Sequence, residues 1–244
     1  MKLKPPQLRI DADFFCFRSA AAAEEELELD EDLTVIIGNL SEGQKVFTKE
    51  ITNLQAKFDS KDVLLTWTDR RNFRKDIDPA YKSNRKKRKP AGYLRLKKWA
   101  METWPSLTIA GIEADDVLGI ICTKDEDTNF VLVSPDKDLK QIPCRQFDLK
   151  DEYTVEPQDA ELQLYTQCLT GDSVDGFKGI PGVGPKKAQA ILAKAQDGFW
   201  PACVEAYEKA GLSHEDALRN LRLARILQAS DWDEANNQPI LFTP

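Results

Sequence analysis

Hydrophobic and polar residues follow two alternating patterns along the first two thirds of the chain. Short apolar runs with the character of buried strands read LRIDADF, LTVIIGNL, DVLLTWT, LTIAGI and NFVLVS. Helices are predicted for Ser19 to Leu29 and for GYLRLKKWAMETW, EADDVLGIICTK and PDKDLKQI, whereas RQFDL fits an edge strand and Glu42 to Phe58 stays undecided. This alternation predicts an α/β fold with a mostly parallel central sheet flanked by helices.

From about Pro157 the pattern becomes helical throughout. Helices are expected over Gln158 to Cys168, Pro185 to Ala195, Phe199 to Ala210 and His214 to Ala229. No low-complexity linker separates this part from the rest. We therefore expect an N-terminal α/β domain over residues 1–156 and a C-terminal helical region over residues 157–244 that packs against it.

Carboxylates recur in short clusters, most of them directly after a predicted strand. The nine that we single out are Asp11, Asp69, Glu113, Asp115, Asp116, Asp136, Asp138, Asp172 and Asp175. Open α/β sheets build their sites at the carboxyl ends of strands, and acids gathered there repel one another unless a cation neutralises them. Oxygen ligands without histidine or cysteine predict Mg²⁺ or Mn²⁺.

Each cluster taken alone also fits a helix cap or a solvated turn, because Asp and Glu supply 41 of the 244 residues. Five clusters nevertheless share the order of apolar run, acid, and turn or helix. That repetition favours one multi-carboxylate metal site over five unrelated caps.

The remaining composition excludes several classes of site. His214, the only histidine, follows Ser213 at a predicted helix start, so neither a histidine-based triad nor a histidine–metal site is expected. The five cysteines are scattered without a CxxC pair, which argues against a zinc ribbon or a disulfide framework and fits the cytoplasm. No apolar stretch has the length of a membrane span, and the first residues lack the apolar core of a signal peptide.

Positive charge is concentrated in one strip, although the chain as a whole carries −7. Residues 70–98 hold 13 Lys and Arg against 2 Asp and Glu, a local charge of +11 that leaves −18 for the remainder. Phe73, Tyr81, Tyr93 and Trp99 lie among these cations, and such a mixture suits a nucleic-acid strand whose bases stack and whose phosphates pair. The alternative is a solvated loop or a targeting tag. The position directly after Asp69 favours nucleic acid, because a bound polyanion would then lie beside the metal cluster.

The stretch GFKGIPGVGPKKAQAIL has the pattern of a helix-hairpin-helix motif, at about residues 169–195. Glycines allow the backbone to approach a phosphate, and the N–H groups at the start of a helix then bind the anion without reading bases. A Walker A loop is excluded, because Gly184 is followed by Pro185 instead of lysine. A plain helix-capping turn is the remaining alternative.

Four motifs together resemble the flap endonuclease and 5′-to-3′ exonuclease superfamily, with the exonucleases of podoviruses the most similar. They are GIEADD, VSPDKD, the stretch FRKDIDPAYKSNRK and TGDSVDGFKGIPGVG. In those phage enzymes the first motif likewise has two aspartates two positions apart, as Asp11 and Asp13 are here. The similarity extends from Leu8 to about Ile191.

The resemblance implies a divalent-metal-dependent 5′-to-3′ exonuclease or flap endonuclease, with the nine carboxylates as metal ligands and Asp13 behind them. It assigns catalysis to Lys82 and Arg85, which would stabilise charge on the phosphate. It implies DNA contacts, in an arch at about residues 70–98 and at the hairpin, for Arg74, Tyr81, Lys82, Arg85, Lys86, Lys87, Gly182, Gly184, Lys186 and Lys187. A K⁺ ion at the hairpin is a further expectation.

The implied partner is DNA with 5′ ends or 5′ flaps, and RNA–DNA hybrids are a possible second substrate. The expected setting is phage DNA replication or host DNA degradation, in the host cytoplasm. The protein is expected to be a monomer, and the stretch NNQPILFTP does not match a sliding-clamp peptide. Two alternatives stay open: a PIN-type ribonuclease, which shares the acidic sheet edge, and a non-catalytic DNA-binding protein.

Overall fold

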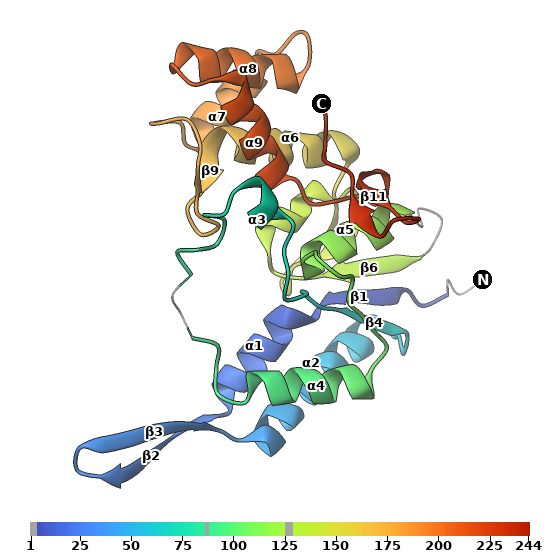
Figure 1. Cartoon of the computed structure of the whole chain (residues 1–244). Helices are drawn as coiled ribbons and strands as arrows, with labels where there is room; N and C mark the ends of the chain where they lie inside the picture. The colour runs from blue at the N-terminus through green and yellow to red at the C-terminus, as the bar shows by residue number, and fades with distance from the viewer. Residues whose placement is uncertain (1–3, 86–87, 125–128) are drawn as a thin grey trace.

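The computed structural model describes residues 4–85, 88–124 and 129–244, and a six-stranded sheet forms its centre (Figure 1). Across the sheet the strands are β5 (Ser106–Leu107), β4 (Val63–Thr66), β1 (Gln7–Asp11), β6 (Phe130–Val133), β7 (Arg145–Phe147) and β8 (Glu152–Thr154). Neighbouring strands run parallel except for β8, which is antiparallel to β7. The predicted mostly parallel sheet is confirmed.

Strand β6 is apolar on both faces, whereas β1 carries apolar side chains on one face and the buried Arg9 on the other. Leu8 and Ile10 of β1 lie opposite Val131 and Val133 of β6, and all four are fully buried. This register brings the carboxyl ends of β1, β4 and β6 to the same edge of the sheet. The residues that follow each strand therefore meet there.

Helices cover the two faces of the sheet as separate layers (Figure 1). On one face α1 (Ala12–Ala22), α2 (Leu40–Lys57) and α4 (Tyr93–Thr103) enclose a core that includes Phe15, Phe47 and Trp67. On the other face α5 (Ala114–Lys124) packs Leu118 against Leu132 of β6. Asn39 begins α2 by accepting a hydrogen bond from Glu42 N, so the undecided stretch is helical.

The C-terminal part is mostly helical and has a core of its own. Its helices are α6 (Pro157–Thr170), α7 (Pro185–Leu192), α8 (Phe199–Lys209) and α9 (His214–Ala224), with short strand pairs β9 (Gly171–Asp172)/β10 (Phe177–Lys178) and β11 (Trp232–Asp233)/β12 (Gln238–Pro239). Leu164, Tyr207 and Leu221 lie in this core. Two 3₁₀ turns, η1 (Lys137–Gln141) and η2 (Ala229–Asp231), join it to the sheet layer.

The last predicted helix is shorter than expected. It ends at Ala224, and the backbone N–H groups of Ile226 and Leu227 donate to Gln141 and Asp116 instead of to helix carbonyls. Side chains of α5 and η1 thus redirect this segment across the sheet layer.

The structure corrects one predicted helix. Helix α1 ends at Ala22, and the following residues form β2 (Glu24–Asp30), which pairs with β3 (Leu33–Gly38) in a hairpin outside the central sheet (Figure 1). Successive glutamates disfavour a helix, because like charges three and four positions apart repel one another. The run LTVIIG is a strand as predicted, but in this hairpin.

The basic strip contains little regular structure before α4. A single turn, α3 (Arg74–Ile77), is followed by turns over the described residues up to Arg85, and the chain then returns to α4 at Tyr93. Among the described residues, no helix is long and apolar enough to cross a membrane.

Candidate active site

A cavity of about 560 Å³ opens at the carboxyl edge of the central strands, and acids line most of it. Seven of the nine predicted carboxylates line it: Asp11, Glu113, Asp115, Asp136, Asp138, Asp172 and Asp175. Lys82 and Arg85 lie in the same wall. The structure thus brings together most of the predicted site.

The sheet edge supplies five of these acids. Asp11 is the last residue of β1 and accepts a hydrogen bond of 3.1 Å from Ser134 Oγ, just beyond β6. Glu113 and Asp115 lie at the start of α5, where the helix dipole favours negative charge. Asp136 caps η1 by accepting from the N–H of Asp138.

The helical region supplies the other two acids, from the turn between β9 and β10. Asp172 accepts hydrogen bonds from the N–H groups of Val174 and Asp175, at 2.7 and 3.1 Å. This turn holds Asp175 towards Lys82, whose backbone N–H donates to the Asp175 carbonyl. The site therefore joins the sheet layer to the helical region.

Crowding of acids raises proton affinity within the pocket. Burial, with Asp13 and Asp136 nearby, raises the pKa of Asp11 to about 7. Burial and Asp136 raise the pKa of Asp138 to about 6. The pKa of Asp115 also lies well above its ordinary value, because of burial and the charges of Asp11 and Asp136.

Cations from the basic strip neutralise the opposite side of the pocket. Lys82 Nζ lies 2.5 Å from Glu113 Oε1 and 3.5 Å from Asp175 Oδ2, and Arg85 lies 2.5 Å from Asp175 Oδ1. Burial alone would raise the pKa of Glu113, but Lys82 and Arg74 outweigh it and lower that pKa to about 2. Lys82 holds a left-handed backbone with φ of 56°, a conformation that few non-glycine residues adopt.

The donor chemistry of the pocket fits hard divalent cations. Its acids offer only oxygen atoms, and the buried Oδ1 of Asp138 has no hydrogen-bond partner among the described residues. Among the described residues, no group of three or more acids is placed closely enough to hold one metal ion. A bound cation would neutralise the repulsion that raises their pKa values.

The predicted roles of Asp116 and Arg74 are corrected. Asp116 is fully buried and binds Arg74 through two contacts of 2.7 Å, and Arg74 also donates to the carbonyls of Leu223 and Arg225. Neither residue lines the pocket. Asp116 is therefore held as a structural ion-pair partner, and Arg74 is buried too deeply to steer a DNA strand.

The structure also places Asp69 and Tyr81 differently from the predictions. Asp69 accepts hydrogen bonds from Gly111 N at 2.8 Å and Arg71 N at 3.4 Å, and it lies outside the pocket lining. Tyr81 is buried, and its hydroxyl donates to Glu113 and Asp175, so it is not exposed for stacking on a base. The Asp69 carboxylate thus binds the backbone at Gly111 and Arg71, and the Tyr81 hydroxyl positions Glu113 and Asp175.

Asp13 also lines the pocket, from the first turn of α1 rather than from the strand with Asp11. It accepts hydrogen bonds from Thr68 N at 2.7 Å and from the Tyr93 hydroxyl at 2.6 Å, and Lys97 Nζ lies 3.4 Å away. Sequence reasoning assigned no role to Lys97. The spacing of four residues between Tyr93 and Lys97 could have indicated a shared role, because it places both side chains on one face of α4.

The predicted hairpin forms a turn that leads into α7. Gly184 precedes Pro185 at the start of α7, and Gly182 has a φ of 74° that requires glycine. A side chain on either glycine would meet no atom within 4 Å, so this backbone is open to a ligand. Lys186 and Lys187 are exposed, and Lys187 Nζ donates to the Gly182 carbonyl. Lys86 and Lys87 lie outside the described residues.

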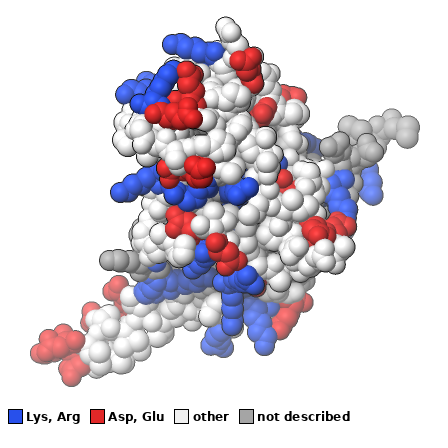
Figure 2. Space-filling view, turned by 45° about the horizontal axis from the view of Figure 1, so that its top comes forward, with Lys and Arg blue, Asp and Glu red and all other residues white. Residues whose placement is uncertain are grey.

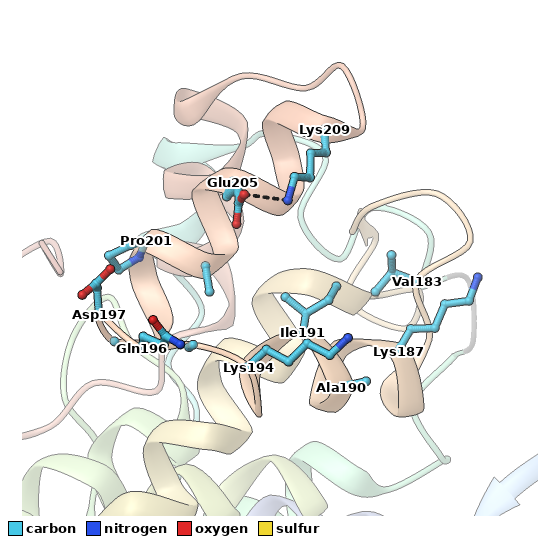
Figure 3. A pocket seen from close by; sticks show the side chains of 13 residues that line it. Val183, Lys187, Ala190, Ile191, Lys194, Gln196, Asp197, Pro201, Glu205 and Lys209 are labelled. Carbon is cyan, nitrogen blue, oxygen red and sulfur yellow. Dashed lines mark ion pairs between the residues drawn. The ribbon is translucent and has the colours of Figure 1, made fainter.

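A groove of about 790 Å³ runs beside this turn, between α7 and α8 (Figure 3). Lys187 extends from α7 and Lys194 from the turn directly after it, and Lys209 of α8 forms an ion pair of 2.6 Å with Glu205. The turn and the groove together present lysines from two helices on one side of the helical region.

Comparisons with known proteins show the family of the chain. The family model described as "5'-3' exonuclease, N-terminal resolvase-like domain" matches residues 7–166. Across 97% of its length the chain is 25% identical to the exodeoxyribonuclease of Enterobacteria phage T3 and to the exonuclease of Escherichia phage T7, covering 92% and 93% of those proteins.

A solved structure shows the same fold. The crystal structure of a bacteriophage T5 flap endonuclease variant, a pseudo-enzyme–product complex with DNA and metal ions, matches with a TM-score of 0.67 at 18% identity. The match covers 90% of this chain and 88% of that one.

We predict that Asp116→Ala lowers the free energy of unfolding by about 3–5 kcal/mol, because it leaves the Arg74 guanidinium buried and unpaired. Urea denaturation followed by circular dichroism measures this. Asp76→Ala is the matched control, since Asp76 pairs with Arg71 on the surface; its loss should cost no more than about 1 kcal/mol. Equal effects of the two substitutions would contradict the structural role.

We also predict that the metal-free protein loses stability as the pH rises from 5 to 8. Asp11, Asp115 and Asp138 have raised pKa values, so between those pH values the folded state holds protons that the unfolded state has released. Thermal melts in chelator measure the effect. Mg²⁺ should restore the melting temperature at pH 8 and change it little at pH 5, where protons compete. A melting temperature that rises with pH in chelator would count against the acid cluster.

Proposed function

The chain belongs to the 5′-3′ exonuclease family, and on that premise we propose that its acidic pocket hydrolyses DNA phosphodiester bonds from a 5′ end or at a 5′ flap. The observation that carries the proposal is the meeting of seven carboxylates, Lys82 and Arg85 in one cavity. Acids from four separate segments have no structural need to share a cavity, because their mutual repulsion destabilises the fold.

Of the eight acids that line the pocket, the seven other than Asp13 are the proposed ligands of Mg²⁺ or Mn²⁺. Two such ions would activate a water and stabilise the leaving oxygen. Asp11, Asp115 and Asp138 have raised proton affinity and few hydrogen-bond donors, so they supply the uncompensated charge that a cation would neutralise. The metal-bound T5 relative supports this cofactor class.

Lys82 and Arg85 are the proposed catalytic cations. Both now pair with Asp175, and Lys82 also pairs with Glu113. A scissile phosphate in the pocket gives these cations a second anion to bind, where they can stabilise charge as the bond breaks. Arg85 is half exposed and reaches towards the open side.

The helical region over residues 157–244 is the proposed duplex-binding part. Gly182, Gly184, Lys186 and Lys187 offer open backbone and exposed ammonium groups for phosphates without reading bases. Lys194 extends the same basic surface along the groove. K⁺ at this turn stays a prediction.

Product lengths from 5′-labelled substrates would test the proposed reaction. A flap, a blunt duplex, an RNA–DNA hybrid and single-stranded RNA are incubated with Mg²⁺ or with chelator. The proposal expects cleavage of the DNA substrates with Mg²⁺ alone. Cleavage of RNA alone would favour a PIN-type ribonuclease, and DNA binding without cleavage would favour a non-catalytic protein.

We predict that Asp115→Asn lowers the cleavage rate at least about 100-fold while flap affinity changes little, because it removes a charge that faces the cations and not the duplex. Single-turnover cleavage and DNA binding in Ca²⁺ measure the two quantities. The control is Asp148→Asn, at a turn remote from the pocket lining, whose oxygen still accepts from Lys150 and Asp151. Near-normal turnover by Asp115→Asn would sink the metal assignment.

Lys82→Ala should slow cleavage about 100–1,000-fold with less than about a tenfold change in DNA affinity. It should also tighten Mn²⁺ binding by the DNA-free protein, since it removes a cation from Glu113 and Asp175. Single-turnover kinetics and metal titration by calorimetry give the two results. Lys98→Ala, an exposed lysine of α4, is the control. Weaker Mn²⁺ binding by Lys82→Ala would show that the lysine does not compete with the metal.

A further inference from the structure

The hairpin of β2 and β3 projects away from the rest of the protein (Figure 1). Throughout the described part of the chain, its two strands pair with each other and with no third strand. An isolated two-stranded ribbon has little core and is marginal in water by itself. The hairpin therefore exposes two strand edges and two faces.

Apolar side chains are unusually exposed on this ribbon. Leu27, Leu29, Leu33, Ile36 and Ile37 are between 40% and 57% exposed, and they are five of the eleven large apolar side chains exposed in the described protein. Cross-strand pairs place Leu27 with Val35 on one face, and Ile37 two positions along on the same face. An apolar strip gathered on one short element marks a contact surface rather than scattered surface residues.

The charge of the hairpin indicates which kind of molecule the strip contacts. Residues 24–38 contain seven Asp and Glu and no Lys or Arg. Acids gather at the projecting tip, away from the basic surface of the central part (Figure 2). A polyanion such as DNA is repelled there, whereas a surface that carries lysine and arginine is attracted.

The base of the hairpin is fixed to the end of the basic strip. Glu24 accepts hydrogen bonds from Arg88 and from the N–H of Ala91, and Asn39 donates to Glu25. Gly38 lies so close to Ala91 that a side chain there would lie 2.3 Å from the Ala91 carbonyl oxygen. A molecule held on the hairpin is thereby held beside the proposed arch.

We propose that residues 24–38 form a docking site for a partner protein whose surface presents an apolar strip rimmed by lysine and arginine. The apolar face of the hairpin covers that strip, and its acids pair with the basic rim. A strand of seven residues spans only about 23 Å. The contact is thus smaller than the roughly 800 Å² per partner of a standard interface, which implies a transient, salt-sensitive complex.

A labelled peptide of alternating leucine and lysine reproduces this chemistry and serves as the probe. Its binding to the full chain is measured by fluorescence anisotropy, and hydrogen exchange locates the protected residues. We expect protection over residues 24–38. We also expect at least about tenfold tighter binding than for a peptide of alternating serine and lysine or of alternating leucine and glutamate.

The double variant Leu27→Ser/Ile37→Ser should lose that tenfold preference. Leu94→Ser/Met101→Ser, which removes two exposed apolar side chains from α4, should keep it. Glu26→Lys/Glu28→Lys, which reverses two charges of the hairpin, should also lose that preference. Equal peptide binding by all variants, or protection elsewhere than residues 24–38, overturns the proposal.

Cleavage of a short 5′ flap separates this inference from the proposed function. The hairpin variants should cleave it at the wild-type rate, because the docking site is not part of the pocket. If Leu27→Ser/Ile37→Ser instead weakens flap binding several-fold, the hairpin contacts DNA and the docking proposal fails, whatever the fate of the nuclease assignment.

Discussion

The buried ion pair between Arg74 and Asp116 joins the segments on which the pocket depends. Arg74 belongs to α3 at the start of the basic strip, Asp116 to the first turn of α5, and both bind the backbone after α9. A charge pair this deep is stable only when every donor and acceptor is satisfied, and here the surrounding carbonyl and N–H groups achieve that. The arch, the sheet edge and the helical region are thereby fixed relative to one another.

Unlike the neutralised Arg74–Asp116 ion pair, the pocket concentrates negative charges. Asp11, Asp115 and Asp138 each lie near the charge of Asp136 and accept few hydrogen bonds, whereas Glu113 and Asp175 are paired with cations of the strip. Repulsion between these carboxylates destabilises the folded state, and a cost of this kind is typical of functional sites. One side of the cavity thus concentrates negative charge, where we propose the metal ions, and the other holds cations, where we propose the phosphate.

Charge is also segregated over longer distances. The hairpin of residues 24–38 is acidic and partly apolar, while the basic strip and the groove beside α7 carry lysine and arginine. The proposed DNA contacts and the proposed protein contact therefore occupy different surfaces. Because Glu24 binds Arg88 and Ala91, the two surfaces meet at one end of the arch.

The sequence by itself determined the α/β class, the mostly parallel sheet and most of the acid cluster, because apolar runs and the acids after them are local patterns. Tertiary structure decided which acids are ligand candidates: Asp115 and Asp116 are adjacent in sequence, yet only Asp115 faces the cavity, since Arg74 binds the other. It likewise buried Tyr81 and turned residues 24–30 into a strand. A carboxylate, an aromatic ring or a run of glutamates takes its role from partners distant in sequence, and local composition does not specify those partners.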